Sequence, residues 1–216
     1  MEEKMMNELY AISPIDGRYA KMVEELREYF SEYALIKYRV LVEVEWLIKL
    51  FRKDNGVLSL LTDIEPLTME EEEKLYSVFN AFTMEDALRV KEIETITKHD
   101  VKAVEYFIRE KIERFSSFIH FACTSEDISN LAYGLMLKDT LNKVLIPIQE
   151  ELKNKVKEIA KETVSKPILS HTHGQPASPT TVGKELLVFV ERWENIINLI
   201  ENAKITGKFS GAVRQF

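Results

Sequence analysis

Two of the four histidines in the chain lie within one short polar stretch, Ser170–Pro176, whose sequence is SHTHGQP. An imidazole has an unperturbed pKa of about 6.5, so a histidine here can give or take a proton near neutral pH. Gly174 permits a backbone conformation that leaves the ring of His173 accessible. Two other interpretations stay open. One is a His-x-His metal chelate, although no cysteine partner, HExxH motif or acidic cluster accompanies it. The other is local hydrogen bonding to the backbone.

His99 stands where a helix is expected to begin. Thr97 and Asp100 have the spacing of a capping box, and an apolar pattern of helical period follows them. The positive end of a helix dipole disfavours an imidazolium and favours anions. His99 could therefore bind a phosphate or act as a neutral hydrogen-bond donor. The alternative is a histidine that only hydrogen-bonds locally at the helix start.

Two further polar segments have the composition of ligand-binding turns. Thr124 and Ser125 bring hydroxyl and N–H groups to the start of a long helical pattern, which suits a carboxylate, although the acidic residues after them oppose one. Simple helix capping is the alternative there. Near the N-terminus, the tight turn Asp16–Gly17 is followed by Arg18 and Tyr19. These two side chains could face a ligand or belong to an ordinary surface loop.

Helices must position these segments, because glycine and proline are absent from residues 67–133 and no stretch shows sustained period-two alternation. Helices are predicted to run over about 31–52, from Thr68, over about 83–97, from about 100, over about 124–161 with a kink at Pro147, and from Ser178 to about 205. The last helix is expected to carry a bundle seam formed by Val182, Leu186, Phe189, Trp193, Ile196, Ile200 and Ala203. We therefore expect an all-α fold, with an N-terminal helical domain over 1–115 and the first long helices of an elongated helical bundle over 116–216.

The composition and net charge of the chain limit the partners and the cellular location that we expect for it. Residues are 45% hydrophobic and 30% charged, and the formal net charge of −7 argues against a nucleic-acid partner. A single cysteine, Cys123, cannot form an internal disulfide and is expected to be a buried, inert thiol in a reducing compartment. The N-terminal residues lack the features of a secretory signal, and no apolar run is long enough to cross a membrane. A cytoplasmic location is expected.

Four segments together resemble the adenylosuccinate lyase family, within the fumarase/aspartase superfamily. They are Ser13–Tyr19 (SPIDGRY), Lys98–Tyr106 (KHDVKAVEY), Phe118–Ile128 (FIHFACTSEDI) and Thr172–Ala177 (THGQPA), and they occur in the order seen in that family. A lone Thr-His-Gly-Gln indicates only the superfamily, whereas the first two segments narrow the resemblance to this enzyme. The resemblance covers essentially all 216 residues but only about the first half of a family chain.

The resemblance implies a β-elimination that cleaves adenylosuccinate to AMP and fumarate, and likewise the succinylated aminoimidazole carboxamide ribotide, without metal or organic cofactor. It makes His173 the general acid and places His99 beside the substrate. The binding residues that it implies are Arg18 and Tyr19 for the nucleotide, Asp100 for the ribose region, Thr124 and Ser125 for the succinyl carboxylate, and Lys98 and Gln175 as further candidates.

The chain also departs from the family pattern. His171 stands where many relatives carry arginine, and Lys98 where some carry asparagine. The last residues, 211–216, read GAVRQF where GAVGN and an aromatic residue are expected. The family's flexible loop with the catalytic base, and its C-terminal domain, are not among the 216 residues.

The resemblance implies a homotetramer with sites shared between subunits, and we expect the chain to self-associate and to be inactive alone. The alternatives are a non-catalytic helical module for nucleotide binding or assembly, and another lyase of the superfamily.

Overall fold

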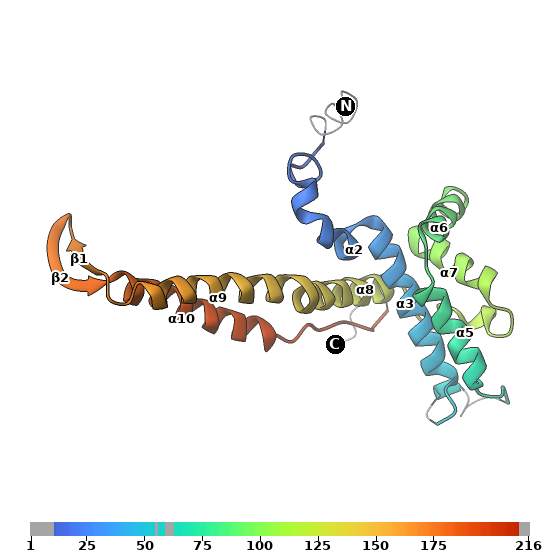
Figure 1. Cartoon of the computed structure of the whole chain (residues 1–216). Coiled ribbons are helices and arrows are strands. Elements are labelled where there is room, and N and C mark those ends of the chain that lie inside the picture. Colours follow the sequence, from blue (N-terminus) through green and yellow to red (C-terminus); the bar gives the residue numbers. More distant parts are fainter. Residues whose placement is uncertain (1–10, 55, 59–62, 212–216) are drawn as a thin grey trace. The chain divides into compact units, whose positions relative to one another are not determined.

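The computed structural model describes residues 11–54, 56–58 and 63–211, and it divides the chain into two compact units (Figure 1). The first unit comprises residues 1–138 and 206–216, and the second comprises residues 139–205. The units group residues by their contacts and do not test the expected domain boundary near residue 115, which stays a prediction. The departure noted at the C-terminal end falls on residues 212–216, outside the described residues.

The first unit is helical, as predicted. Its elements are η1 (Ala20–Leu26), α2 (Arg27–Phe30), α3 (Glu32–Phe51), α5 (Met69–Asn80), α6 (Met84–Thr97), α7 (Asp100–Lys111), η2 (Ser116–Phe118) and most of α8 (Ser125–Thr140).

Helix starts in this unit follow the local chemistry of their capping residues. The Ser31 hydroxyl accepts a hydrogen bond from the N–H of Ala34, which opens α3. Thr68 and Thr83 each form a complete capping box, with Glu71 and Asp86 respectively. These three predicted helix starts are confirmed.

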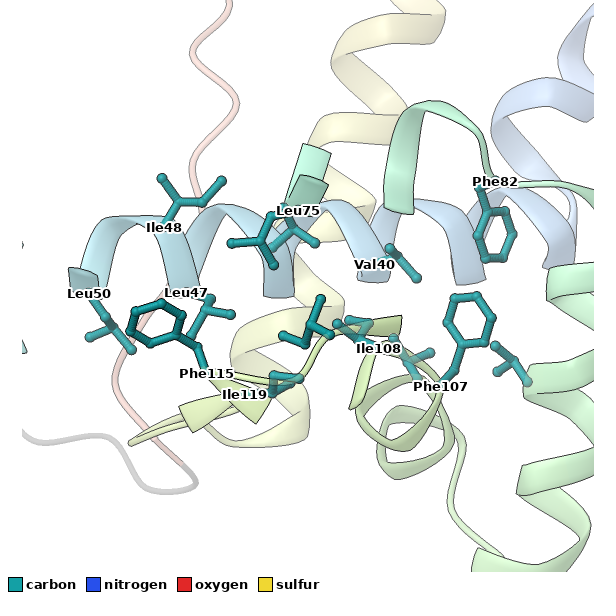
Figure 2. Packing of buried hydrophobic residues seen from close by; sticks show 14 of the residues in the cluster. Val40, Leu47, Ile48, Leu50, Leu75, Phe82, Phe107, Ile108, Phe115 and Ile119 are labelled. Carbon is teal, nitrogen blue, oxygen red and sulfur yellow. The ribbon is translucent and has the colours of Figure 1, made fainter. Parts of the chain in front are cut away.

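Apolar side chains from α3, α5, α6, α7 and η2 form the main core of the first unit. Figure 2 shows aromatic and aliphatic side chains of this core packed around α3. Phe51 lies 4.6 Å from Phe115 and 4.8 Å from Phe118, and Phe82 lies 5.7 Å from Phe107, between ring centroids. This packing fixes α7 and the chain that follows it against α3.

A second, smaller core cluster joins α3, α7 and α8. It contains Ala34, Tyr38, Val42, Val101, Ile128, Ala132 and Met136. Val101 is the second residue of α7 and Ile128 the fourth of α8, so this cluster packs the starts of the two helices against α3.

The long predicted helix over 124–161 is present, but its irregularity has a different form from the expected kink. After α8 the chain continues through a π-helical turn, η3 (Leu141–Leu145), into α9 (Ile146–Glu162). Pro147 falls in the first turn of α9, directly after the π-helical turn, and it cannot donate a hydrogen bond to that turn. The wider turn ahead of the proline absorbs the break in the hydrogen-bond ladder.

The second unit consists of η3, α9, a β-hairpin and α10 (Val182–Glu201). The hairpin pairs β1 (Pro167–Thr172) with β2 (Gln175–Thr181) in an antiparallel ladder. The expected loop at 170–176 is therefore wrong, and so is the helix start at Ser178, which lies within β2. The helix begins only after Thr181, whose hydroxyl accepts from the N–H of Lys184 at 3.2 Å. The helix also ends at Glu201, earlier than the predicted stop near 205.

Helices α9 and α10 pack closely within this unit. A Cβ on Gly183 would lie 2.3 Å from the backbone oxygen of Ala160, so only glycine fits this crossing. Lys153 is buried and forms ion pairs of 2.7 Å with both Glu150 and Glu194. The Trp193 indole N–H donates to the side-chain oxygen of Gln149 at 2.7 Å.

The predicted seam of α10 is partly wrong. The fully buried positions are Gly183, Val190 and Ile197, whereas Phe189 and Ile196 are more than half exposed. The partly buried Leu186, Trp193 and Ile200 of the predicted seam stay on the packed face, whereas the next residues along the chain replace Val182, Phe189 and Ile196 there. No helix within the described ranges combines the length and the apolar character needed to cross a membrane.

Candidate functional site

Two of the predicted site residues, His99 and Ser125, meet at the starts of α7 and α8, inside the first unit. His99 is the N-cap of α7, and its Nδ1 accepts a hydrogen bond from the N–H of Lys102 at 3.2 Å. Its Nε2 lies 3.3 Å from the hydroxyl oxygen of Ser125, the first residue of α8. Because Nδ1 is occupied as an acceptor, the ring is a neutral tautomer with its proton on Nε2, which donates to Ser125. The expected capping box at Thr97 is wrong, since His99 itself caps the helix.

Asp100 lies next to His99 and is held by an arginine that the sequence analysis did not single out. Arg39 of α3 forms an ion pair of 2.7 Å with Asp100, and its Nη2 also donates to the hydroxyl of Ser129 at 3.1 Å. Burial tends to raise the pKa of Asp100, but the N–H of Val101 and the Arg39 guanidinium outweigh it and lower that pKa. The carboxylate is half exposed and ionised, so it can accept hydrogen bonds from a bound hydroxyl group.

Thr124 directly precedes α8 and is hydrogen-bonded to the carboxylate of Asp127, three residues further along the chain. Its N–H and its hydroxyl both donate to Oδ2 of Asp127, at 2.9 and 2.8 Å. Asp127 is fully buried and also accepts from the backbone N–H groups of Ser210 and Gly211. The hydroxyl proton of Thr124 is therefore committed within the protein, whereas the O–H of Ser125 remains available to a ligand.

The loop before Thr124 also holds His120. Its Nδ1 lies 2.6 Å from Oε1 of the buried Glu43, and its backbone N–H donates to Oε2 at 3.1 Å. The hydrogen bond to Glu43 raises the pKa of His120 against the opposing effect of burial. Cys123 in the same loop is half-buried, and burial together with the carboxylates of Glu43 and Asp127 raises the pKa of its thiol to about 12. The expectation of an inert thiol agrees with this environment.

Backbone strain accompanies these segments. Within the part of the chain that the structure describes, four non-glycine residues have positive φ: Lys98 (53°), His120 (63°), Ala122 (57°) and His173 (50°). Each lies in or beside a segment that the sequence marked for chemistry. Left-handed backbone at non-glycine residues costs of order 1 kcal/mol and is concentrated at functional sites.

His173 and Gln175 belong to the second unit, at the end of the β-hairpin. Thr172 pairs with Gln175, so His173 and Gly174 form a two-residue turn, and both have positive φ, as a type I′ turn requires. The turn places the His173 ring at an exposed hairpin tip. His171 lies further down β1, opposite Pro176.

Arg18 and Tyr19 follow a compact turn in which the N–H groups of Asp16 and Gly17 donate to the carbonyl oxygen of Ser13. The guanidinium carbon of Arg18 lies 5.4 Å from the centre of the Tyr19 ring. Both side chains are exposed. Among the described residues, neither shares a hydrogen bond or an ion pair with the cluster around His99.

The chain is similar to known lyases in sequence and in structure. The family model described as "Lyase" matches residues 17–215. Adenylosuccinate lyase from Dictyostelium discoideum is 47% identical over 220 residues, covering 96% of this chain and 46% of that protein. Adenylosuccinate lyases from Haemophilus influenzae and Escherichia coli K12 are 45% and 42% identical, each covering 98% of this chain and 46% of the relative.

Solved structures support the same fold at lower identity. A fumarate lyase from Mesorhizobium sp. BNC1 superposes with a TM-score of 0.68 at 19% identity, covering 88% of this chain and 42% of that one. A β-carboxy-cis,cis-muconate cycloisomerase from Acinetobacter calcoaceticus superposes with a TM-score of 0.63 at 18% identity, covering 88% and 43%. The chain spans about half the length of the relatives it matches. It belongs to the lyase family, and what it matches in the adenylosuccinate lyases is their N-terminal half.

Proposed function

We propose that the chain supplies one part of an adenylosuccinate lyase active site, which cleaves a carbon–nitrogen bond to release fumarate and leave AMP, and acts likewise on the succinylated aminoimidazole carboxamide ribotide. The observation that carries the proposal is the 3.3 Å contact between Nε2 of His99 and the hydroxyl of Ser125, at the starts of two helices. A neutral donor, a free hydroxyl proton and helix N–H groups suit a substrate with several negative charges. The similarity to adenylosuccinate lyases supplies the substrate.

The reaction is a β-elimination. A base removes a proton from the carbon next to a carboxylate, the electron pair forms the new double bond of fumarate, and the bond to the purine nitrogen breaks. A general acid protonates that nitrogen as it leaves. His173 is the proposed acid, because the hairpin turn exposes an imidazole that is not tied to a structural partner among the described residues.

The first unit supplies binding groups. Ser125 and the first N–H groups of α8 hold the succinyl carboxylate, with Thr124 keeping the helix start in place through Asp127. His99 orients the substrate or its phosphate, with Lys98 beside it, and Asp100 accepts from a ribose hydroxyl. Arg18 and Tyr19 contact the nucleotide, and Gln175 beside the acid is a further contact.

The base and further binding groups come, in this proposal, from sequence that the relatives have beyond the matched half. We further propose a homotetramer in the cytoplasm. Apolar side chains on α10 support self-association, since Phe189, Ile196 and Leu199 are 59%, 53% and 68% exposed. A groove beside them is lined by Val156, Leu186, Phe189, Arg192, Trp193 and Ile196.

Fumarate release from adenylosuccinate tests this function. The 216-residue chain alone is expected to show no turnover, and the chain joined to the C-terminal half of the Dictyostelium relative is expected to show turnover. His173→Ala in that joined protein should lower kcat at least about 100-fold, the usual size of a general-acid contribution.

The matched comparison is His171→Arg, which removes an imidazole from the same hairpin but installs the residue common among relatives, and which should retain turnover. Turnover by the 216 residues alone, or a fully active His173→Ala protein, contradicts the proposal. AMP binding measured by calorimetry without any turnover in the joined protein favours a binding module instead.

A further inference from the structure

Two buried charges of opposite sign lie one turn apart on α3, a helix that otherwise buries apolar side chains. The side chain of Arg39 is 8% exposed and that of Glu43 is fully buried. Burying a charge is costly unless it is paired and hydrogen-bonded, so each must be held by specific partners. Their partners belong to the segments that carry His99 and Ser125.

Arg39 joins the starts of α7 and α8. Its Nη2 bonds both to the carboxylate of Asp100, the first residue of α7, and to the hydroxyl of Ser129, one turn into α8. Because one nitrogen makes both bonds, this single group holds the two acceptors close to each other. Arg39 therefore sets how far apart His99 and Ser125 lie.

Glu43 holds the loop that leads into Ser125. Its two carboxylate oxygens bind the backbone N–H and the ring Nδ1 of one residue, His120. Trp46, also on α3, donates its indole N–H to the carbonyl oxygen of Phe121 at 2.8 Å. Hydrogen bonds from α3 thus hold two consecutive residues of the loop, His120 and Phe121.

The backbone conformation of the loop explains why these hydrogen bonds are needed. His120 and Ala122 both have left-handed backbone, with φ of 63° and 57°. Neither residue is glycine, so the loop adopts this path only when its surroundings impose it. Without Glu43, the two residues would relax toward ordinary backbone angles and carry Thr124 and Ser125 with them.

We infer that Arg39 and Glu43 are positioning residues that fix the distance between His99 and Ser125. Arg39 contacts one group proposed to bind substrate, Asp100, and Glu43 acts on Thr124 and Ser125 through the 119–124 loop. The inference rests on the proposed function only in assigning substrate binding to His99 and Ser125. The contact between these two residues is present in the chain itself.

Nitrogen-15 NMR of the histidine rings and backbone amides of the 216-residue chain tests this. In the wild type, the His99 ring should be protonated on Nε2. Glu43→Gln keeps the size of the side chain but replaces one of its two acceptor oxygens with a donor. It should shift the Nε2 signal of His99 and the amide signal of Ser125, and weaken hydrogen-exchange protection of the Thr124 amide about tenfold.

A second variant, Ser129→Ala, removes one acceptor of Arg39 without altering a buried charge, and it should shift the same His99 signal even if Glu43→Gln fails to fold. The matched control is Glu71→Gln, because Glu71 is also a hydrogen-bonded carboxylate, but its partners Thr68 and Arg114 lie outside the segments that carry His99 and Ser125. It should leave the Ser125 amide signal in place.

Unchanged His99 and Ser125 signals in the folded variants overturn the inference, as does equal perturbation by the control. Because no substrate enters these measurements, their outcome is independent of whether the lyase proposal holds. A positioning role is thus separable from the substrate assignment.

Discussion

The backbone N–H of Ser210 donates a 3.0 Å hydrogen bond to Oδ1 of Asp127, a residue 83 positions earlier in the chain. The same carboxylate caps α8 through Thr124, and Lys208 exchanges two hydrogen bonds with the side-chain amide of Asn130. One buried acid therefore joins the start of a central helix to the segment that returns after α10. The returning segment and Thr124 are therefore hydrogen-bonded to the same carboxylate, that of Asp127.

Replacing Asp127 should destabilise the first unit in a pH-dependent way. Burial tends to raise the pKa of Asp127, but hydrogen bonds from Thr124, Ser210 and Lys208 outweigh it and lower the pKa to about 2, from an ordinary 3.8. A pKa that is lower in the folded chain means that the carboxylate stabilises the fold above about pH 4 and loses this contribution as pH falls toward 2. We expect Asp127→Asn to cost about 2 kcal/mol at pH 7.

Urea unfolding at pH 7 and near pH 2 measures this difference. Fluorescence of Trp46, whose ring centre lies 4.5 Å from that of Phe209, reports on the returning segment directly. The exposed neighbour Glu126 provides the control, and Glu126→Gln should change stability by less than about 0.5 kcal/mol. A difference between wild type and Asp127→Asn that does not shrink in acid contradicts the prediction.

Cys123 should resist alkylation in the folded chain. A thiol with a pKa of about 12 holds almost no thiolate at neutral pH, and the thiolate is the reacting species. Iodoacetamide at pH 8 should modify the native chain at least about 100-fold more slowly than the urea-unfolded chain. Mass spectrometry of timed samples gives both rates, and similar rates would show that the loop leaves the thiol open.

Gly183→Ala should destabilise the second unit by about 2 kcal/mol, because the new Cβ would meet backbone atoms of Ala160 and Val164 at 2.3 and 2.7 Å. Backbone at both contacts leaves no flexible side chain to move aside. The comparison is Gly174→Asn at the hairpin turn, where a Cβ meets no atom within 4 Å and asparagine tolerates positive φ. Chemical denaturation should show a loss for the first variant and near-neutral stability for the second.

Self-association should depend on the exposed stripe of α10. Placing a charge there, as in Phe189→Glu or Ile196→Glu, should shift the chain toward monomer without unfolding it, because both side chains are more than half exposed. Sedimentation velocity across a concentration series tests this, with Lys184→Glu on the same helix as a comparison. A wild-type chain that sediments as a clean monomer throughout contradicts the proposed assembly.

Sequence alone predicted the helical elements of the first unit well, because capping is local chemistry. Ser31, Thr68 and Thr83 each bind an N–H group three residues ahead, and the pattern is legible without any tertiary contact. The hairpin was missed for an equally physical reason. Most residues of its two strands are exposed, so neither strand has the alternation of buried and exposed side chains by which strands are recognised.

Sequence predicted only those site residues whose side-chain type by itself suggests binding or proton transfer. His99 and Ser125 were expected near ligand groups, and the structure brings them together. Arg39 and Glu43 were overlooked, although two charges spaced one turn apart within an apolar helix are a usable signal. The buried positions of α10 could not be chosen from sequence, because Phe189 and Val190 are adjacent apolar residues, as are Ile196 and Ile197. Packing on α9 decides which residue of each pair is buried.

The turn at His173 has a consequence for the stability of the hairpin. A type I′ turn favours asparagine or glycine at its first central position, and histidine there carries left-handed strain, with φ of 50°. Random substitution of this histidine by asparagine or glycine would make the hairpin more stable. A histidine at this tip is therefore less favourable for hairpin stability than either of those residues.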